Sequence, residues 1–231
     1  MSIAENIARV REKIADAERK AGRKEGSVAL MAVSKFHPAG SVLEAMAAGQ
    51  RLFGENRVQE ATEKFAEVAA RQPGAELHLI GTLQRNKVAK IITVASCVQS
   101  VDREELLSEI ERQAAARDLS IRVLFEFHTG EESKSGYPDR DSLFRSIDLL
   151  AAMPHVRCSG LMTMAPFTAD RDAVRASFSA LKSLQDECHR RYSALDFSIL
   201  SMGMSADFEL AIAEGSTLVR VGTAIFGERA P

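Results

Sequence analysis

The stretch LSMGMSADFELAIAEGSTLVRVGTAIFG, residues 200–227, decides the fold of this chain. Apolar runs near its start and its end predict strands over 197–201 and 217–221, and the amphipathic segment between them predicts a helix over 205–214. Gly215 stands where that helix should stop. Apolar strands that alternate with helices are typical of a parallel sheet covered on both faces. We therefore expect a β–α–β unit here.

The same alternation of short apolar and longer amphipathic segments extends back through the chain. It predicts six further strands, over 28–34, 51–53, 76–80, 97–101, 120–127 and 156–162. It predicts helices between them, over 38–48, 56–70, 83–93, 103–117, 139–152 and 170–192. Ahead of the first strand, an apolar stripe at helical spacing predicts an extra N-terminal helix, and its members are Ile3, Ile7, Val10, Ile14 and Ala17.

Local signals indicate where some helices begin and end. Asp102 and Glu105 have the spacing of a capping box, which predicts a helix start at that point. Gly49 and the Pro73-Gly74 pair stand where the preceding helices should stop.

Eight parallel strands separated by helices are the number that closes a (β/α)8 barrel. The length of 231 residues suits such a barrel, which typically takes about 250. The alternative is an open doubly wound sheet, but no GxGxxG follows the first strand. The sequence therefore predicts an α/β fold: one TIM-type barrel domain over residues 1–231, with the extra N-terminal helix.

Composition excludes several classes of function. The net charge of −2 with mixed signs gives no basic surface for nucleic acid. No apolar stretch of 18 residues is present, and the N-terminus is amphipathic, so neither a membrane span nor a signal peptide is expected. Cys97, Cys158 and Cys188 fit no metal or disulfide pattern, and the five histidines are scattered. We expect a cytoplasmic protein without a metal site.

Lys35 closes the apolar run VALMAVS, residues 28–34. In a barrel of this type the chemistry lies at the C-terminal ends of the strands, which is where this lysine falls. Burial disfavours an ammonium, lowers its pKa and frees the amine to form a Schiff base with a carbonyl compound. The alternative is a lysine whose stem covers apolar surface while its head reaches water.

The loop after the seventh strand predicts an anion site. Gly203 permits a tight turn with close backbone approach, and Ser205 is placed to cap the following helix. Exposed N–H groups of such a loop favour a phosphate, and barrels often bind phosphate after strands seven and eight. The candidate phosphate ligands are Ser201, Gly203, Met204 and Ser205, with Gly222 and Thr223 after strand eight. The alternative is an ordinary strand–turn–helix junction.

Arg220 falls inside the last predicted strand and needs a partner, because an unpaired buried charge is costly. Contact with a phosphate and contact with a pyridine nitrogen are both compatible with its position. An amine and a phosphate cradle on one rim of a barrel suggest pyridoxal 5′-phosphate as the cofactor.

Four further residues are weaker candidates. Asn56 either lies against a cofactor ring or caps a helix, and His78 is expected to be a hydrogen-bonded core histidine. Glu55 is either an exposed loop carboxylate or a base. Lys134, in EESKSG, is expected to be solvated, with help in receiving a ligand as the alternative.

Several segments between residues 30 and 228 together resemble the pyridoxal phosphate homeostasis protein family (the YggS/PROSC family): AVSKFHP, FGENRVQE, HLIGTLQRNK, SVD, GEESKSG, GLMTMAP and residues 200–227. The resemblance implies a barrel of the alanine racemase N-terminal domain type. It implies that Lys35 holds pyridoxal phosphate as an internal aldimine and that Asn56 lies beside the ring. It implies a phosphate site made of Ser201, Gly203, Met204 and Ser205, with Arg220, Gly222 and Thr223.

Two segments depart from the usual pattern of that family. Phe36-His37 replaces a Thr-Lys pair after Lys35, so no second lysine stands there. FEFH replaces an asparagine-containing strand, so Phe127 is expected to alter that side of the pocket.

The resemblance implies a role in intracellular pyridoxal phosphate homeostasis, as a carrier or buffer rather than an enzyme. Related racemases carry a second, β-rich domain, and this chain ends soon after its eighth strand. A cofactor in an open barrel mouth suits storage and transfer. A monomer that passes the cofactor to dependent apoenzymes is expected. The alternatives are a pyridoxal phosphate-dependent amino-acid racemase, a cofactor-free Schiff-base aldolase acting on a sugar phosphate, and a scaffolding barrel.

Overall fold

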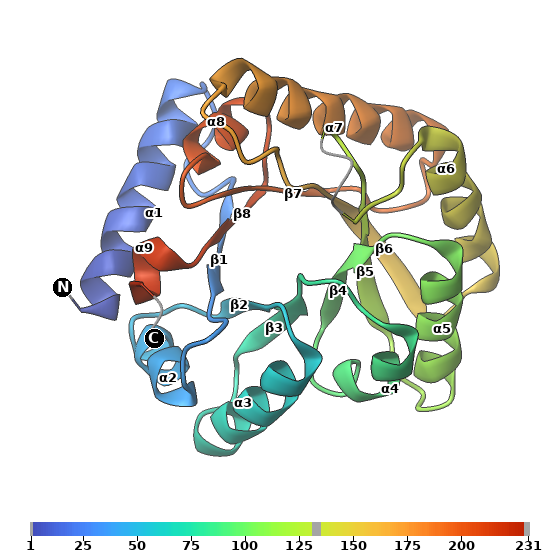
Figure 1. The fold of residues 1–231 in the computed structure, drawn as a ribbon, viewed down its shortest axis with the longest axis horizontal. Coiled ribbons are helices and arrows are strands. Elements are labelled where there is room, and N and C mark those ends of the chain that lie inside the picture. Colours follow the sequence, from blue (N-terminus) through green and yellow to red (C-terminus); the bar gives the residue numbers. More distant parts are fainter. Residues whose placement is uncertain (1, 131–134, 229–231) are drawn as a thin grey trace.

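A computed structural model describes residues 2–130 and 135–228. Within these residues, eight parallel strands close a barrel in sequence order, and Figure 1 looks along its axis. Pairing of β1 with β8 closes the ring, with Ala29 opposite Leu218. The strands are β1 (Ala29–Val33), β2 (Leu52–Glu55), β3 (Glu76–Leu79), β4 (Cys97–Val101), β5 (Ile121–Glu126), β6 (Val156–Met162), β7 (Ile199–Met204) and β8 (Leu218–Val221).

Helices surround the barrel on the outside (Figure 1). They are α1 (Ile3–Lys20), α2 (Ala39–Ala47), α3 (Val58–Arg71), α4 (Val88–Ile91), α5 (Glu104–Ala115), α6 (Arg140–Asp148), α7 (Arg171–Arg191), α8 (Phe208–Ala213) and α9 (Thr223–Phe226), with 3₁₀ turns η1 (Arg85–Lys87) and η2 (Leu149–Ala152). The extra helix α1 lies against α2, α8 and α9. Its buried residues include Ile7, Val10 and Ile14, so the predicted apolar stripe is confirmed.

The main apolar core lies between the barrel and the helices, because alternate strand residues point outward to that layer. The barrel interior differs in chemistry. It holds a small apolar cluster of Cys97, Leu124 and Met162, together with buried polar side chains. The three cysteines are free and buried.

All eight predicted strands are present, and the predicted TIM-type barrel is confirmed. The largest error concerns the end of β7, which continues to Met204 because Met204 pairs with Arg220 of β8. The helix predicted over 205–214 accordingly begins only at Phe208. The short helix α9 was not predicted.

Two predicted helix caps are wrong. Helix α5 has Arg103 as its N-cap with no side-chain cap, and Asp102 instead forms an ion pair with Arg103. Ser205 does not cap α8, because Asp207 is its N-cap residue and no side chain caps it. The predicted helix stops are confirmed, since Gly49, Gly74 and Gly215 have φ angles of +81°, +101° and +101°.

The described residues contain neither a membrane-spanning helix nor a cluster of metal-binding side chains. None of these helices is long and apolar enough to cross a membrane. No group of three or more His, Cys, Asp or Glu side chains in the same residues is placed to hold a metal ion.

Candidate cofactor site

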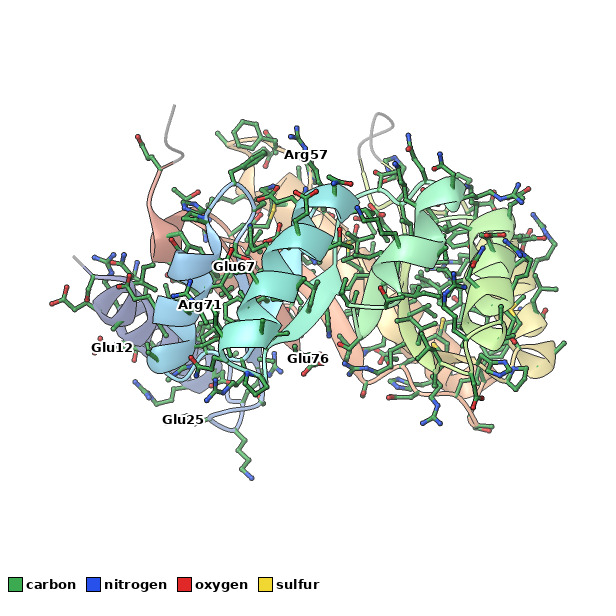
Figure 2. All side chains as sticks on the ribbon, turned by 90° about the horizontal axis from the view of Figure 1, so that it is seen from below. Glu12, Glu25, Arg57, Glu67, Arg71 and Glu76 are labelled. Atoms are coloured by element: carbon green, nitrogen blue, oxygen red, sulfur yellow. The ribbon has the colours of Figure 1, made fainter. Side chains whose placement is uncertain are left out.

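A cavity of about 410 Å³ opens at the C-terminal ends of the strands. Figure 2 shows the barrel from the side, with Arg57 on the rim of this mouth and Glu76 near the opposite rim. The cavity is lined by Val33, Lys35, Asn56, Ile80, Met162, Met164, Phe167, Met204, Ser205, Ala206, Arg220, Gly222 and Thr223. Seven of the nine predicted site residues are in this set. Ser201 and Gly203 lie behind the cavity wall, in the part of β7 that precedes Met204.

The turn that carries Lys35 is fixed on both sides of the lysine. Ser34 Oγ donates to Glu55 Oε1 over 2.7 Å, and the Phe36 N–H donates to Glu60 Oε1 over 2.5 Å. Phe36 has a φ angle of +68°, which is uncommon for a residue other than glycine. Lys35, half-buried, is therefore held in a defined turn at the cavity wall.

A buried ion cluster lies behind this turn. Lys64 Nζ is 2.8 Å from both Glu55 Oε1 and Glu60 Oε1, and it donates to the Ser34 carbonyl over 2.7 Å. Burial raises the pKa of Glu55, and its hydrogen bonds with Lys64 and Ser34 oppose that rise. Strand residues alternate in direction, so Glu55 faces α3 while its neighbour Asn56 lines the cavity. The interpretation of Glu55 as an exposed loop carboxylate is wrong.

Lys64→Met is expected to lower the free energy of unfolding by about 3 kcal/mol, because it leaves two carboxylates and a carbonyl without their cation. Arg71→Met is the matched control on the same helix (Figure 2), since Arg71 pairs with Glu67 at the surface. An exposed pair contributes about 0.5 kcal/mol or less. Urea denaturation measures both variants. Equal losses would contradict the role of this cluster.

The turn after β7 exposes backbone donors. Among the described residues, the N–H groups of Ser205, Ala206 and Thr223 donate to no protein acceptor. The Met204 N–H is used within the turn and donates to Asp207 Oδ1 over 2.6 Å. Free N–H groups with the hydroxyls of Ser205 and Thr223 form a cradle suited to an anion.

Arg220 lies at the floor of the cavity, on the inward face of β8 and two residues before Gly222. Its Nη1 donates to Ser201 O and Ser201 Oγ over 2.8 and 2.7 Å, and its Nη2 donates to Thr163 O over 2.8 Å. Burial lowers the pKa of Arg220 to about 10, so the guanidinium stays charged at neutral pH. A guanidinium has five N–H donors, and these three bonds leave donors for a ligand.

The remaining walls combine one amide with apolar side chains. Asn56 Oδ1 is buried and has no hydrogen-bond partner, and Asn56 does not cap α3, whose N-cap is Arg57. The apolar lining residues were missed in the sequence, namely Val33, Ile80, Met162, Met164 and Phe167. Val33 could have been found from Lys35, since strand residues two apart share a face.

Glu126 is a further buried carboxyl at this end of the barrel, and the sequence analysis missed it. It is the last residue of β5, is 2 % exposed, and accepts a hydrogen bond from Ser135 Oγ over 2.9 Å. Burial raises the pKa of Glu126 to about 7, while the hydrogen bond from Ser135 opposes that rise. Its neighbour Phe127 packs against the main core and is not among the residues that line the cavity.

Glu126→Gln is expected to change how stability depends on pH. An acid whose pKa rises on folding binds more protons in the folded state, so its contribution is full below pH 4.5 and is lost as pH rises to about 7. Relative to the wild type, Glu126→Gln should therefore gain about 2 kcal/mol between pH 4 and pH 8. Urea denaturation across this range measures the difference. A constant difference between the two proteins would contradict the buried acid.

Two further predictions concern residues near the site. His78 is 1 % exposed and hydrogen-bonded on both ring nitrogens, so the predicted core histidine is confirmed. His37 occupies the position at which the resembling family usually has a second lysine. Its ring stacks on that of Phe226, with 5.1 Å between the ring centroids. Lys134 lies outside the described residues.

The donor set fits an aromatic aldehyde that carries a phosphate. Lys35 offers an amine, the turns after β7 and β8 offer anion donors, and apolar side chains offer a wall for a ring. The described lining contains no Asp, Glu, His, Cys or Tyr. The cavity is thus equipped to bind such a group, with Lys35 as the one described lining side chain that carries an amine.

The fold belongs to a known class of barrel. The family described as alanine racemase, N-terminal domain, matches residues 3–230, and the chain belongs to it. An alanine racemase structure from Clostridium difficile has a TM-score of 0.73 at 13% identity, over 96% of this chain and 57% of that one, and shows a shared fold.

Closer relatives define the family within that class. A pyridoxal phosphate homeostasis protein from Vibrio cholerae is 41% identical, over 99% of this chain and 97% of its own length. Another from Pseudomonas aeruginosa is 42% identical, over 99% and 96%. The structure of PipY from Synechococcus elongatus with PLP bound has a TM-score of 0.86 at 37% identity, covering 98% of this chain and 100% of that one. The chain belongs to the pyridoxal phosphate homeostasis protein family.

Proposed function

We propose that this protein binds pyridoxal 5′-phosphate through Lys35 and serves intracellular pyridoxal phosphate homeostasis as a carrier or buffer. The observation that carries the proposal is the meeting of one amine, one guanidinium and two donor-rich turns in a single cavity. The PLP-bound structure of PipY, a relative of the same fold, supports it.

The positions of the lining residues suggest how the cofactor would be held. Ser205, Gly222 and Thr223 lie at the outer turns and would bind the phosphate, while Met204, whose N–H is used within the turn, would line the cavity beside it. Arg220 lies deeper in the barrel, so we assign it to the pyridine nitrogen. When bound, the aldehyde supplies a carbon that condenses with an amine, releasing one water as a C=N bond forms.

The remaining predicted residues take different roles. Asn56 would lie beside the ring, with its unpartnered Oδ1 facing ligand atoms. Ser201 does not line the cavity and would contribute by accepting a hydrogen bond from Arg220. Gly203, with its positive φ angle, would allow the turn that carries Met204 and Ser205.

A carrier fits this site better than a racemase. Racemisation needs groups that remove and return a proton on opposite faces of a carbon, and the described lining offers Lys35 but no carboxylate, imidazole or phenol. We also propose that the protein acts as a monomer in the cytoplasm and that apoenzymes dependent on pyridoxal phosphate receive the cofactor from it.

Transfer to an apoenzyme tests this function. The protein, loaded with pyridoxal phosphate and freed of excess, is mixed with the apo form of a pyridoxal phosphate-dependent aminotransferase. We expect the aminotransferase to regain activity while the visible absorption of the carrier declines. Formation of D-amino acid from L-amino acid by the loaded protein, lost in Lys35→Ala, would instead establish an enzyme.

A further inference from the structure

A continuous line of hydrogen bonds runs from the cavity floor into the barrel interior. Arg220 Nη1 is 2.7 Å from Ser201 Oγ, and Ser201 Oγ is 2.8 Å from Gln99 Oε1. Gln99 Nε2 is 2.8 Å from His78 Nδ1. All four side chains are at least 96 % buried, since none is more than 4 % exposed. The line joins strands β8, β7, β4 and β3 across the barrel.

With Gln99 Oε1 toward Ser201 and Gln99 Nε2 toward His78, each bond of the line has one direction. A guanidinium only donates, so Ser201 Oγ accepts from Arg220 and must direct its own hydrogen to Gln99 Oε1. The Gln99 amide then presents its NH₂ group to His78, and Nδ1 of His78 accepts. Along this line, each hydrogen bond is donated in the direction away from the cavity.

The far end of the line is a carboxylate near the opposite rim. Because His78 Nδ1 accepts, the ring proton is on Nε2 and is donated to Glu76 Oε1 over 3.1 Å. Arg122 also donates to Glu76, and its Nη2 lies 3.2 Å from His78 Nε2, so the Glu76 carboxylate faces both side chains. Glu76 lies far below Arg57 and the mouth in Figure 2. Burial lowers the pKa of His78, which agrees with a neutral ring.

We propose that Gln99 is a positioning residue for the cofactor: through Ser201 it holds the Arg220 guanidinium at the cavity floor. The proposal rests on the proposed function, because it assumes that Arg220 meets the bound ring. Gln99 Oε1 accepts the Ser201 hydroxyl hydrogen, which leaves Ser201 Oγ as an acceptor toward Arg220. If Ser201 lost that acceptor, its hydrogen would turn toward other groups and compete with the Arg220 bond.

Two nearly isosteric variants separate positioning from packing. Gln99→Met keeps the shape but removes the acceptor, whereas Gln99→Glu keeps the acceptor and adds a buried charge. Positioning predicts that Gln99→Met weakens pyridoxal phosphate binding about tenfold and shifts the visible absorption maximum of the bound cofactor, while Gln99→Glu stays within about threefold of the wild type. A purely structural role predicts the reverse order, because burying a charge is the costlier change.

A readout on the protein itself accompanies the titration. Nitrogen NMR should place the His78 proton on Nε2 in the wild type and move it toward Nδ1 in Gln99→Glu, because a carboxylate cannot donate to Nδ1. Loading with pyridoxal phosphate should shift the His78 signals in the wild type and not in Gln99→Met. Ser100→Ala is the control on the same strand, since Ser100 Oγ bonds Gly81 O outside this line.

The outcomes separate the two proposals. A wild type that gives no covalent adduct with pyridoxal phosphate would overturn the proposed function. A wild type that binds while Gln99→Met keeps its affinity and absorption maximum would overturn the role of Gln99. If Gln99→Met fails to fold, Ser201→Ala breaks the same line with a smaller change and carries the same prediction of about tenfold weaker binding.

Discussion

Lys35→Ala is expected to abolish the covalent link to pyridoxal phosphate and to weaken binding by about a hundredfold, which corresponds to about 2.7 kcal/mol. The reason is that Lys35 is the sole lysine among the described residues lining the cavity. The phosphate cradle and Arg220 would remain, so weak noncovalent binding should persist. A spectroscopic titration measures the dissociation constant, and borohydride reduction followed by mass measurement reports the link.

Lys35→Arg is the matched control, because it keeps a positive charge at the wall but is not a nucleophile at neutral pH. It should also fail to give an adduct, while binding more tightly than Lys35→Ala. The buried Lys64 provides a second comparison, since its Nζ is held by three oxygens and should not react. A full adduct yield in Lys35→Ala would contradict the assignment.

Gly203→Ala is expected to lower the free energy of unfolding by about 4 kcal/mol, from strain and overpacking together. Gly203 has a φ angle of +93°, and a Cβ there would lie 2.6 Å from Ala211 Cβ and 2.9 Å from Phe208 Cα. The alanine would push the turn after β7 away from α8. Because that turn carries Ser205, any folded fraction should bind phosphate compounds more weakly. Thermal and urea denaturation measure the loss.

Gly74→Ala separates the two causes. Gly74 has a φ angle of +101° but open space around the position of a Cβ, so its substitution carries backbone strain without a clash. We expect a loss of about 1 kcal/mol there. Similar losses at both glycines would contradict the close packing of β7 on α8.

The spacing of apolar residues, together with glycine and proline at the ends of helices, was enough to predict the barrel. The apolar run VALMAVS at 28–34 contains β1 at Ala29–Val33, because parallel strands covered on both faces carry a nearly continuous apolar signal. Lys35 and the segment around Ser205 could be assigned to one rim, because a barrel brings the C-terminal ends of all its strands together.

Residues whose roles depend on pairing between distant strands could not be predicted. Ser201 was expected in the phosphate loop, but pairing of Met204 with Arg220 extends β7 and turns Ser201 toward the barrel interior. Glu55 and Glu126 are one residue from turns, and the sequence does not show which face of the sheet each occupies. Tertiary contacts with Lys64 and Ser135 decide that.

Few ionisable side chains line the cavity, but many polar side chains lie directly behind its lining. The lining provides an amine and a guanidinium, while the groups that hold them lie one layer behind, in Glu55, Lys64, Ser201 and Gln99. Such a layer fixes the position of binding groups without adding acids or bases to the cavity. This division suits a protein that holds a reactive cofactor and does not use it.

The most direct measurement is borohydride reduction of the purified protein after incubation with pyridoxal phosphate, followed by peptide mass spectrometry. The account predicts one reduced adduct, on Lys35, with a visible absorption band before reduction that disappears afterwards. A protein that stays unmodified and colourless, or an adduct that maps to another lysine while Lys35 stays unmodified, would contradict it.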